Sequence, residues 1–179
     1  VLKKVAIIDR NPQKCAVDPL AEPVDTFFRA DYIIAKFTLQ GLFKHDCLHL
    51  DKAYINGAQM NLVIEDKVDE GDGDTQTDNL SRIFRLKKKA ELTYNEKEIF
   101  HIKDVQIIDM GFAMKDYGID QTPYHGGINW NDLDVKDIDL TAKNLQFKNS
   151  IMSGELKSMS FREKSGYICY SLTGSAKVG

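Results

Sequence analysis

The sequence has few cysteines, and they are widely spaced. Cys15, Cys47 and Cys169 are the three in its 179 residues, and no two of them have the Cys-x-x-Cys spacing of zinc and redox sites. Three cysteines cannot all pair within one chain, so the sequence leaves open either one disulfide or a set of buried free thiols. We therefore expect no metal or redox centre built on cysteine, and the cellular compartment stays open.

Long apolar runs and basic patches are also absent. No apolar run approaches the roughly 18 residues of a membrane-spanning helix. The 24 basic and 27 acidic residues are spread along the chain and give a net charge of −3. This balance lacks the basic footprint of nucleic-acid binding, so we expect no nucleic-acid partner. The apolar content of 42% is ordinary for a folded globular protein.

Catalytic motifs are missing as well. The sequence contains no P-loop, no dinucleotide-binding glycine pattern and no Gly-x-Ser-x-Gly element. His45 and His49 are four residues apart, but in an extended strand this spacing separates them by about 13 Å, too far for one metal ion. We interpret His101, at the start of a strand, as a surface or hydrogen-bonded histidine. We predict that the chain is not an enzyme and contains no metal or cofactor.

Two segments lack a regular apolar pattern. Residues 65–78 are rich in Asp, Glu and Gly, which predicts an exposed acidic loop. A calcium-binding EF-hand loop fits less well, because the twelfth position counted from Asp69 is Leu80 and not a carboxylate. Residues 117–127 contain Pro123 and two adjacent glycines, and we predict a connecting loop there. Residues 39–44 place apolar side chains on one helical face, so a short helical turn is expected.

Apolar residues recur at the same offsets in three stretches of the chain. The three sets are Leu50, Ala53, Ile55, Met60 and Leu62; Ile102, Val105, Ile107, Phe112 and Met114; and Val135, Ile138, Leu140, Leu145 and Phe147. Their starting points are 52 and 33 residues apart. Such internal similarity is typical of repeat architectures, here with insertions between units.

The offsets within each unit predict a bent strand. Alternate side chains of a strand share a face. An odd number of positions between two apolar residues, as from Leu140 to Leu145, would therefore put their side chains on opposite faces of a regular strand. A bulge or tight corner restores the apolar residues to one face. The sequence therefore predicts a mainly β fold over residues 1–179. We expect one curved, elongated antiparallel sheet of repeated strand units, groove-like, with at most one or two short helices.

Two segments near the C-terminal end resemble a known family. Residues 128–140 (INWNDLDVKDIDL) are similar to an I-x-W-x-D-L-x-[LV]-x-x-I element. Residues 156–167 (LKSMSFREKSGY) are similar to an L-x-x-L-S-x-x-E-K-S-G-[FY] segment. Both elements are typical of the large AsmA/TamB-like envelope proteins of Bacteroidota. Residues 2–9, 27–43 and 48–64 follow the order found near the N-terminal end of those proteins, so the resemblance covers most of the chain.

The resemblance implies a location and a role. Proteins of this family are long periplasmic β structures anchored in the inner membrane by one N-terminal helix. The chain would then be an internal piece of a longer protein, with the anchoring helix outside it. TamB is linked to the translocation and assembly of outer-membrane proteins. The wider group resembles bridge-like lipid transfer proteins, in which a bent sheet forms an apolar trough. Phospholipid and an outer-membrane assembly protein are the partners that the resemblance implies.

Three interpretations follow from the sequence. In the first, apolar side chains of the repeat line a groove that shields lipid acyl chains in outer-membrane biogenesis. The groove candidates are Val105, Ile107, Phe112, Met114, Ile138, Leu140, Leu145 and Phe147. In the second, the same residues form the core of a closed β scaffold or docking module for an outer-membrane assembly partner. A carbohydrate-binding domain, based on Tyr117, Tyr124 and Trp130 near a loop, is the third.

Overall fold

The chain folds as one open β-sheet. The computed structural model describes residues 1–9, 26–37, 48–64, 78–84, 98–117, 127–148 and 151–178. These residues form an eight-stranded sheet of order β1-β2-β3-β4-β5-β6-β7, with β8 also paired to β6. The strands are β1 (Leu2–Ile8), β2 (Thr26–Lys36), β3 (Leu48–Ile64), β4 (Glu98–Asp116), β5 (Asp132–Lys148), β6 (Ile151–Glu163), β7 (Ile168–Cys169) and β8 (Gly174–Val178). The predicted mainly β fold is confirmed.

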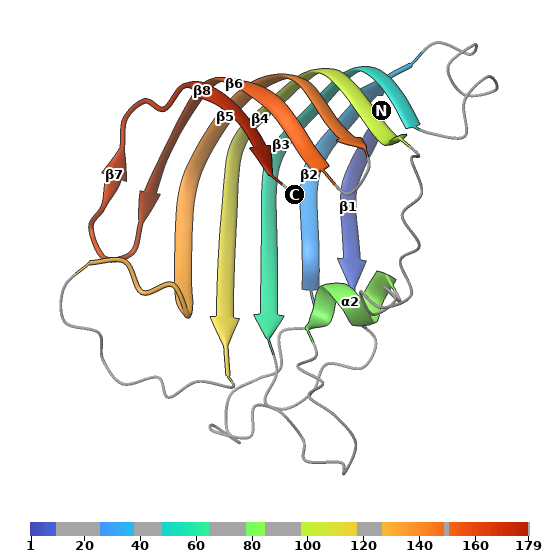
Figure 1. Cartoon of the computed structure of the whole chain (residues 1–179). Coiled ribbons are helices and arrows are strands. Elements are labelled where there is room, and N and C mark those ends of the chain that lie inside the picture. Colours follow the sequence, from blue (N-terminus) through green and yellow to red (C-terminus); the bar gives the residue numbers. More distant parts are fainter. Residues whose placement is uncertain are drawn as a thin grey trace.

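The sheet is strongly curved. Figure 1 shows the long strands rising side by side and then arching over at the top, so that the sheet has the shape of an open shell. The described helix, α2 (Asn79–Phe84), lies below the arch near the ends of β1 and β3. No described helix is long and apolar enough to cross a membrane. The curved sheet expected from the repeat is therefore present, and the predicted helical turn at residues 39–44 lies outside the described residues.

One strand pair departs from the expected antiparallel arrangement. β3 and β4 run parallel, whereas every other pair among the described strands is antiparallel. The parallel register aligns the first two repeat units residue for residue. The aligned pairs are Leu50–Ile102, Ala53–Val105, Ile55–Ile107, Met60–Phe112 and Leu62–Met114. Parallel neighbours require a long crossover connection, and the connection between β3 and β4 carries α2.

Residues with a left-handed backbone lie within the odd steps between apolar residues, where the apolar side chains would otherwise change face. Gly57, Asp109, Asp137 and Asn144 have positive φ values of 61°, 55°, 52° and 52°, and each falls within an odd step of its repeat unit. The pairing of β5 shifts register beside Asp137 and Asn144. These positions confirm the predicted bends. The remaining odd step, from Leu50 to Ala53 and from Ile102 to Val105, shows no positive φ among the described residues.

Few apolar residues are buried in the part of the chain that the structure describes. The buried apolar residues among them are Phe27, Ala30, Ala58, Val105, Leu133, Ile138 and Ala142. Most other apolar residues of the repeat are only half-buried. Within the described ranges, no second sheet packs on the first. One face of the sheet is therefore apolar without being closed over by another described layer.

α2 is fixed to the sheet by one buried amide. The side chain of Asn79 is 1% exposed. Its Nδ2 donates to the carbonyl oxygen of Asn61 at 2.8 Å, and its Oδ1 accepts from the amide of Val63 at 3.0 Å. Asn79 thus pairs with β3 as a neighbouring strand would. Residues 65–77 of the predicted acidic loop and 118–126 of the predicted connecting loop lie outside the described residues.

Candidate functional site

An apolar groove lies across β4, β5, β6 and β8. Its volume is about 480 Å³, within the range of roughly 300–1,000 Å³ typical of ligand pockets. The apolar lining comes from Val105, Ile107, Leu140, Ala142, Leu145, Met152, Leu156, Leu172 and Ala176. Polar lining is limited to Ser153, Glu155, Thr173 and Ser175, with Gly154 and Gly174 adding bare backbone.

The strand register builds the floor of the groove. Val105 of β4 is paired with Ala142 of β5, Ala142 with Leu156 of β6, and Leu156 with Gly174 of β8. This row of paired residues crosses four strands, and its side chains are smallest at Ala142 and Gly174. A neighbouring pair, Ile107 and Leu140, extends the apolar floor along β4 and β5. The alternation of side chains in each strand keeps these residues on one face.

Small residues create the open space. A Cβ atom at Gly174 would meet nothing within 4 Å. At Gly154, a Cβ would lie 3.3 Å from Cδ1 of Leu145, so this glycine allows Leu145 to approach the backbone of β6. A larger side chain at Ala142, which is buried at the centre of the row, would fill the groove instead of lining it.

Leu172 belongs to the segment that connects β7 to β8 and forms one wall of the groove. Its amide donates to the carbonyl oxygen of Met159 at 2.9 Å, which ties this segment to β6. The Cys169 thiol, in β7, is free and half-buried, with Sγ 4.0 Å from the same carbonyl oxygen. Cys15 and Cys47 lie outside the described residues.

The structure brings together half of the predicted groove residues. Val105, Ile107, Leu140 and Leu145 all line the groove. The other four are on the strands but do not line it. Ile138 is buried and is paired with Met110 of β4. Phe112 and Met114 are paired with Val135 and Leu133 of β5. Phe147 stacks on Phe100, with ring centroids 6.1 Å apart.

Several groove residues were not predicted. Ala142 and Leu156 follow the same alternation as their neighbours, and that signal was available in the sequence. Met152 and Leu172 lie in segments outside the repeat, and the sequence carries no pattern that assigns them to the groove. Their contribution depends on how β6 to β8 pair.

A second hollow is polar. It has a volume of about 640 Å³ and runs across β1 to β5 at the level of Lys4, Gly57 and Asp109. The charged residues in its lining are Lys4, Arg29, Asp31, Asp109, Lys136 and Asp137. The lining thus contains charges of both signs, and Asp109 and Asp137 are surface carboxylates on the bends.

Two other groups of titratable side chains are well defined. The parallel register places His49 beside His101, with ring centroids 5.6 Å apart and edge to face.

Glu163 is buried at the end of β6, where its Oε2 accepts from the amide of Ser165 at 2.8 Å. Burial opposes its ionisation, but the hydrogen bonds from Ser165 and Asp134 and the charge of Lys164 outweigh burial and lower the pKa of Glu163. Among the described residues, no three His, Cys, Asp or Glu side chains gather in a way that could hold a metal ion.

The fold and the groove together define a class: an open, curved, bulged β-sheet with an apolar groove on one face. Comparison of the chain with protein-family models, curated proteins and solved structures gives no match. The geometry of the groove is therefore the main basis for assigning a function.

Proposed function

We propose that this chain is a non-enzymatic, lipid-shielding part of an AsmA/TamB-like periplasmic protein that acts in outer-membrane biogenesis. The observation that supports the proposal most is the groove lined by Val105, Ile107, Leu140, Leu145 and Leu156. These side chains lie on a sheet face that no second described layer covers. The chemistry of such a surface suits a hydrocarbon chain.

Burial of methylene groups supplies the affinity. Each CH₂ group moved from water into an apolar site contributes about 0.8 kcal/mol. The few polar groups of the lining, at Ser153, Glu155, Thr173 and Ser175, come from β6, β8 and the segment before β8. A lipid would place its acyl chain over β4 and β5 and its head group toward these residues and water. Because the floor offers no fixed donor or charge, selectivity among acyl chains is expected to be low.

The shape of the sheet favours an elongated ligand. The apolar row continues along β4 and β5 beyond the groove, through the paired residues Met110 and Ile138 and then Phe112 and Val135. An acyl chain in the groove therefore has further apolar surface ahead of it along the same strands. This continuity is what a conduit requires, and a closed single-ligand pocket lacks it.

Native mass spectrometry of gently purified protein tests the proposal. We expect co-purified phospholipid, identified by extraction, and we expect Leu140→Asp to lose it. Thr141→Asp is the matched control, because Thr141 is the next residue of β5 and does not line the groove. It should retain lipid.

A steric variant covers the case in which Leu140→Asp fails to fold. Ala142→Trp keeps the groove apolar but fills it, so bound lipid should fall while circular dichroism and the melting curve remain those of a folded β protein. Lipid-free wild-type protein, or full retention by Ala142→Trp, would contradict the conduit. A closed scaffold for an assembly partner would then be the better account.

A further inference from the structure

β1 forms an open border of the sheet. It is paired with β2 along one side, and no described strand lies against its other side. Figure 1 shows β1 at the right-hand border of the sheet, with β2 as its neighbour. An edge strand has backbone N–H and C=O groups without partners in the sheet, and these groups can hydrogen-bond an additional strand.

β1 has the bend and the apolar pattern of an inner strand. Lys4 has a positive φ of 51°, and the pairing of the first three strands places it level with Asp31 and Gly57. The bend that crosses the sheet therefore continues into β1. Val5 is half-buried and is paired with the buried Ala30, so the apolar face also reaches the border.

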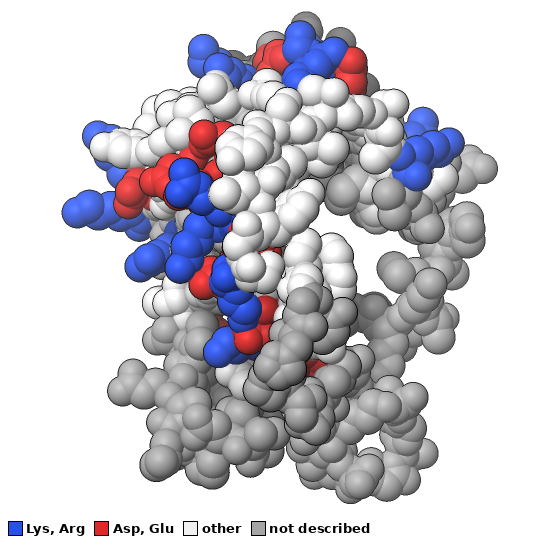
Figure 2. All heavy atoms as spheres, turned by 90° about the vertical axis from the view of Figure 1, so that its left-hand side faces the viewer, with Lys and Arg blue, Asp and Glu red and all other residues white. Residues whose placement is uncertain are grey.

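Ion pairs between neighbouring strands have one order in this sheet. They are Lys103–Asp51 between β4 and β3, Lys143–Asp104 between β5 and β4, and Arg162–Asp137 between β6 and β5. In each pair the carboxylate belongs to the strand on the β1 side, and the basic group to the strand on the β7 side. Figure 2, which faces the β7 end of the sheet, shows basic and acidic side chains next to one another in one column.

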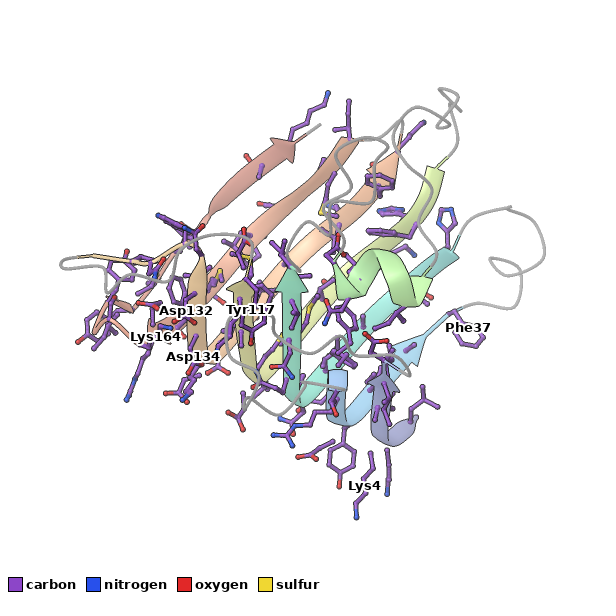
Figure 3. All side chains as sticks on the ribbon, turned by 90° about the horizontal axis from the view of Figure 1, so that it is seen from below. Lys4, Phe37, Tyr117, Asp132, Asp134 and Lys164 are labelled. Atoms are coloured by element: carbon purple, nitrogen blue, oxygen red, sulfur yellow. The ribbon has the colours of Figure 1, made fainter. Side chains whose placement is uncertain are left out.

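Lys4 lacks the carboxylate that this order predicts. It is exposed, and it forms no ion pair with any residue that the structure describes. The carboxylate of Asp31 is turned toward β3, where its Oδ2 lies 2.5 Å from the position of a Cβ at Gly57. Figure 3 shows Lys4 at the border of the sheet, with its side chain directed away from the strands. By the same order, its partner belongs to a strand on the open side of β1.

We propose that the edge of β1 binds an extended, acidic segment of a partner protein as an added strand. The backbone of the segment pairs with β1, one of its apolar side chains continues the face at Val5, and a carboxylate contacts Lys4. In this kind of recognition the main-chain hydrogen bonds supply affinity and the side chains supply specificity.

The charge of the edges selects against a second copy of the chain as the occupant. β1 carries Lys3 and Lys4, and β8, at the other border of the sheet, carries Lys177. Lysines on edge strands discourage the pairing of like edges. The same lysines of β1 favour a strand that brings carboxylates.

A peptide copied from β5 provides a probe of the required chemistry. Residues 132–142 (DLDVKDIDLTA) contain four aspartates that alternate with apolar residues, and Asp137 supplies a left-handed position. A fluorescent copy added to the whole protein should give a saturable increase in anisotropy. A copy with all four aspartates replaced by asparagine should bind several-fold more weakly.

Amide hydrogen exchange, measured by NMR, locates the bound peptide. In the free protein we expect fast exchange at the β1 amides that face the open side, and protection of these amides when the peptide binds. Lys4→Gln should weaken binding of the aspartate peptide several-fold and leave binding of the asparagine peptide unchanged, as expected for groups in contact. Lys177→Gln, on β8, is the matched control and should change neither affinity.

Three outcomes would overturn the proposal. Protection of all β1 amides in the free monomer would show that the edge is already paired within the chain. The same protection with a doubled mass in solution would assign the edge to a second copy. A lack of saturable binding, or peptide binding that protects amides elsewhere than in β1, would exclude an acidic strand as the occupant. The edge lies apart from the groove, so this proposal and the lipid-shielding function fail separately.

Discussion

Gly57 and Asp109 occupy the same position in two parallel strands and share a left-handed backbone. They lie between the paired residues Asn56–Ile108 and Ala58–Met110, with φ values of 61° and 55°. The two left-handed residues thus bend β3 and β4 at the same level. Because both strands bend together, their register continues without a shift through the bend. The curvature of the sheet depends on such matched positions.

Gly57→Ala is expected to destabilise the protein by about 1–2 kcal/mol, since an L-residue in the left-handed region loses roughly this amount. A Cβ at this position would also lie 2.5 Å from Oδ2 of Asp31, so the Asp31 side chain would have to move. Urea unfolding measures the change. Gly174→Ala is the control, because its Cβ meets nothing and its φ is not positive, and it should stay within about 0.5 kcal/mol. Equal losses in the two variants would show that the left-handed backbone at Gly57 does not disfavour a side chain.

Asn79→Ala should cost roughly 1–3 kcal/mol. The substitution leaves the carbonyl oxygen of Asn61 and the amide of Val63 without the partner that Asn79 supplies, at a site that excludes water. We also expect faster amide hydrogen exchange at Val63, measured by NMR. Ser158→Ala, at an exposed position of β6, should change neither quantity. Unchanged exchange at Val63 would mean that α2 does not protect the C-terminal end of β3.

Glu163→Gln should reduce stability most at neutral pH. The pKa of Glu163 is lowered in the folded protein from an ordinary value of 4.5, so the ionised group stabilises the fold above that value. This stability is lost as the pH falls through the folded pKa. The difference in unfolding free energy between wild type and variant should therefore shrink below about pH 4.5.

Urea unfolding at neutral and acidic pH measures this difference. Glu155→Gln is the control, because its carboxylate pairs with Lys157 at the surface and such pairs contribute about 0–1 kcal/mol. A gap between wild type and Glu163→Gln that is constant with pH would show that ionisation of Glu163 does not stabilise the turn.

The bends could be predicted from the sequence, and the pairing direction could not. An odd step between apolar residues, such as Ile107 to Phe112, puts them on opposite faces unless the backbone departs from regular alternation, and Asp109 provides that departure in β4. Alternation itself is the same for parallel and antiparallel neighbours. The equal spacing of the first two units was compatible with either direction, and the parallel pairing of β3 and β4 emerged only from the structure.

The sequence predicts which face of the sheet carries the groove, but not which residues of that face line it. Alternation placed Phe112, Met114 and Phe147 on strands together with Ile107 and Leu140, but the groove forms only where β8 and the segment before it border β6. Phe147 instead meets Phe100 at the far end of β4. The position of Leu172 depends on the pairing of β7 and β8, which the repeat does not encode.

The position of a bound acyl chain tests the central claim most directly. Phosphatidylethanolamine with a diazirine in its acyl chain would be loaded onto the protein and photolysed, and the labelled residues mapped by peptide mass spectrometry. The account predicts labels on groove residues, with Ile107, Leu140 and Leu156 foremost, and none on their strand neighbours Gln106 and Thr141. Labels confined to Gln106, Thr141 or other residues outside the groove, or no specific label, would contradict it.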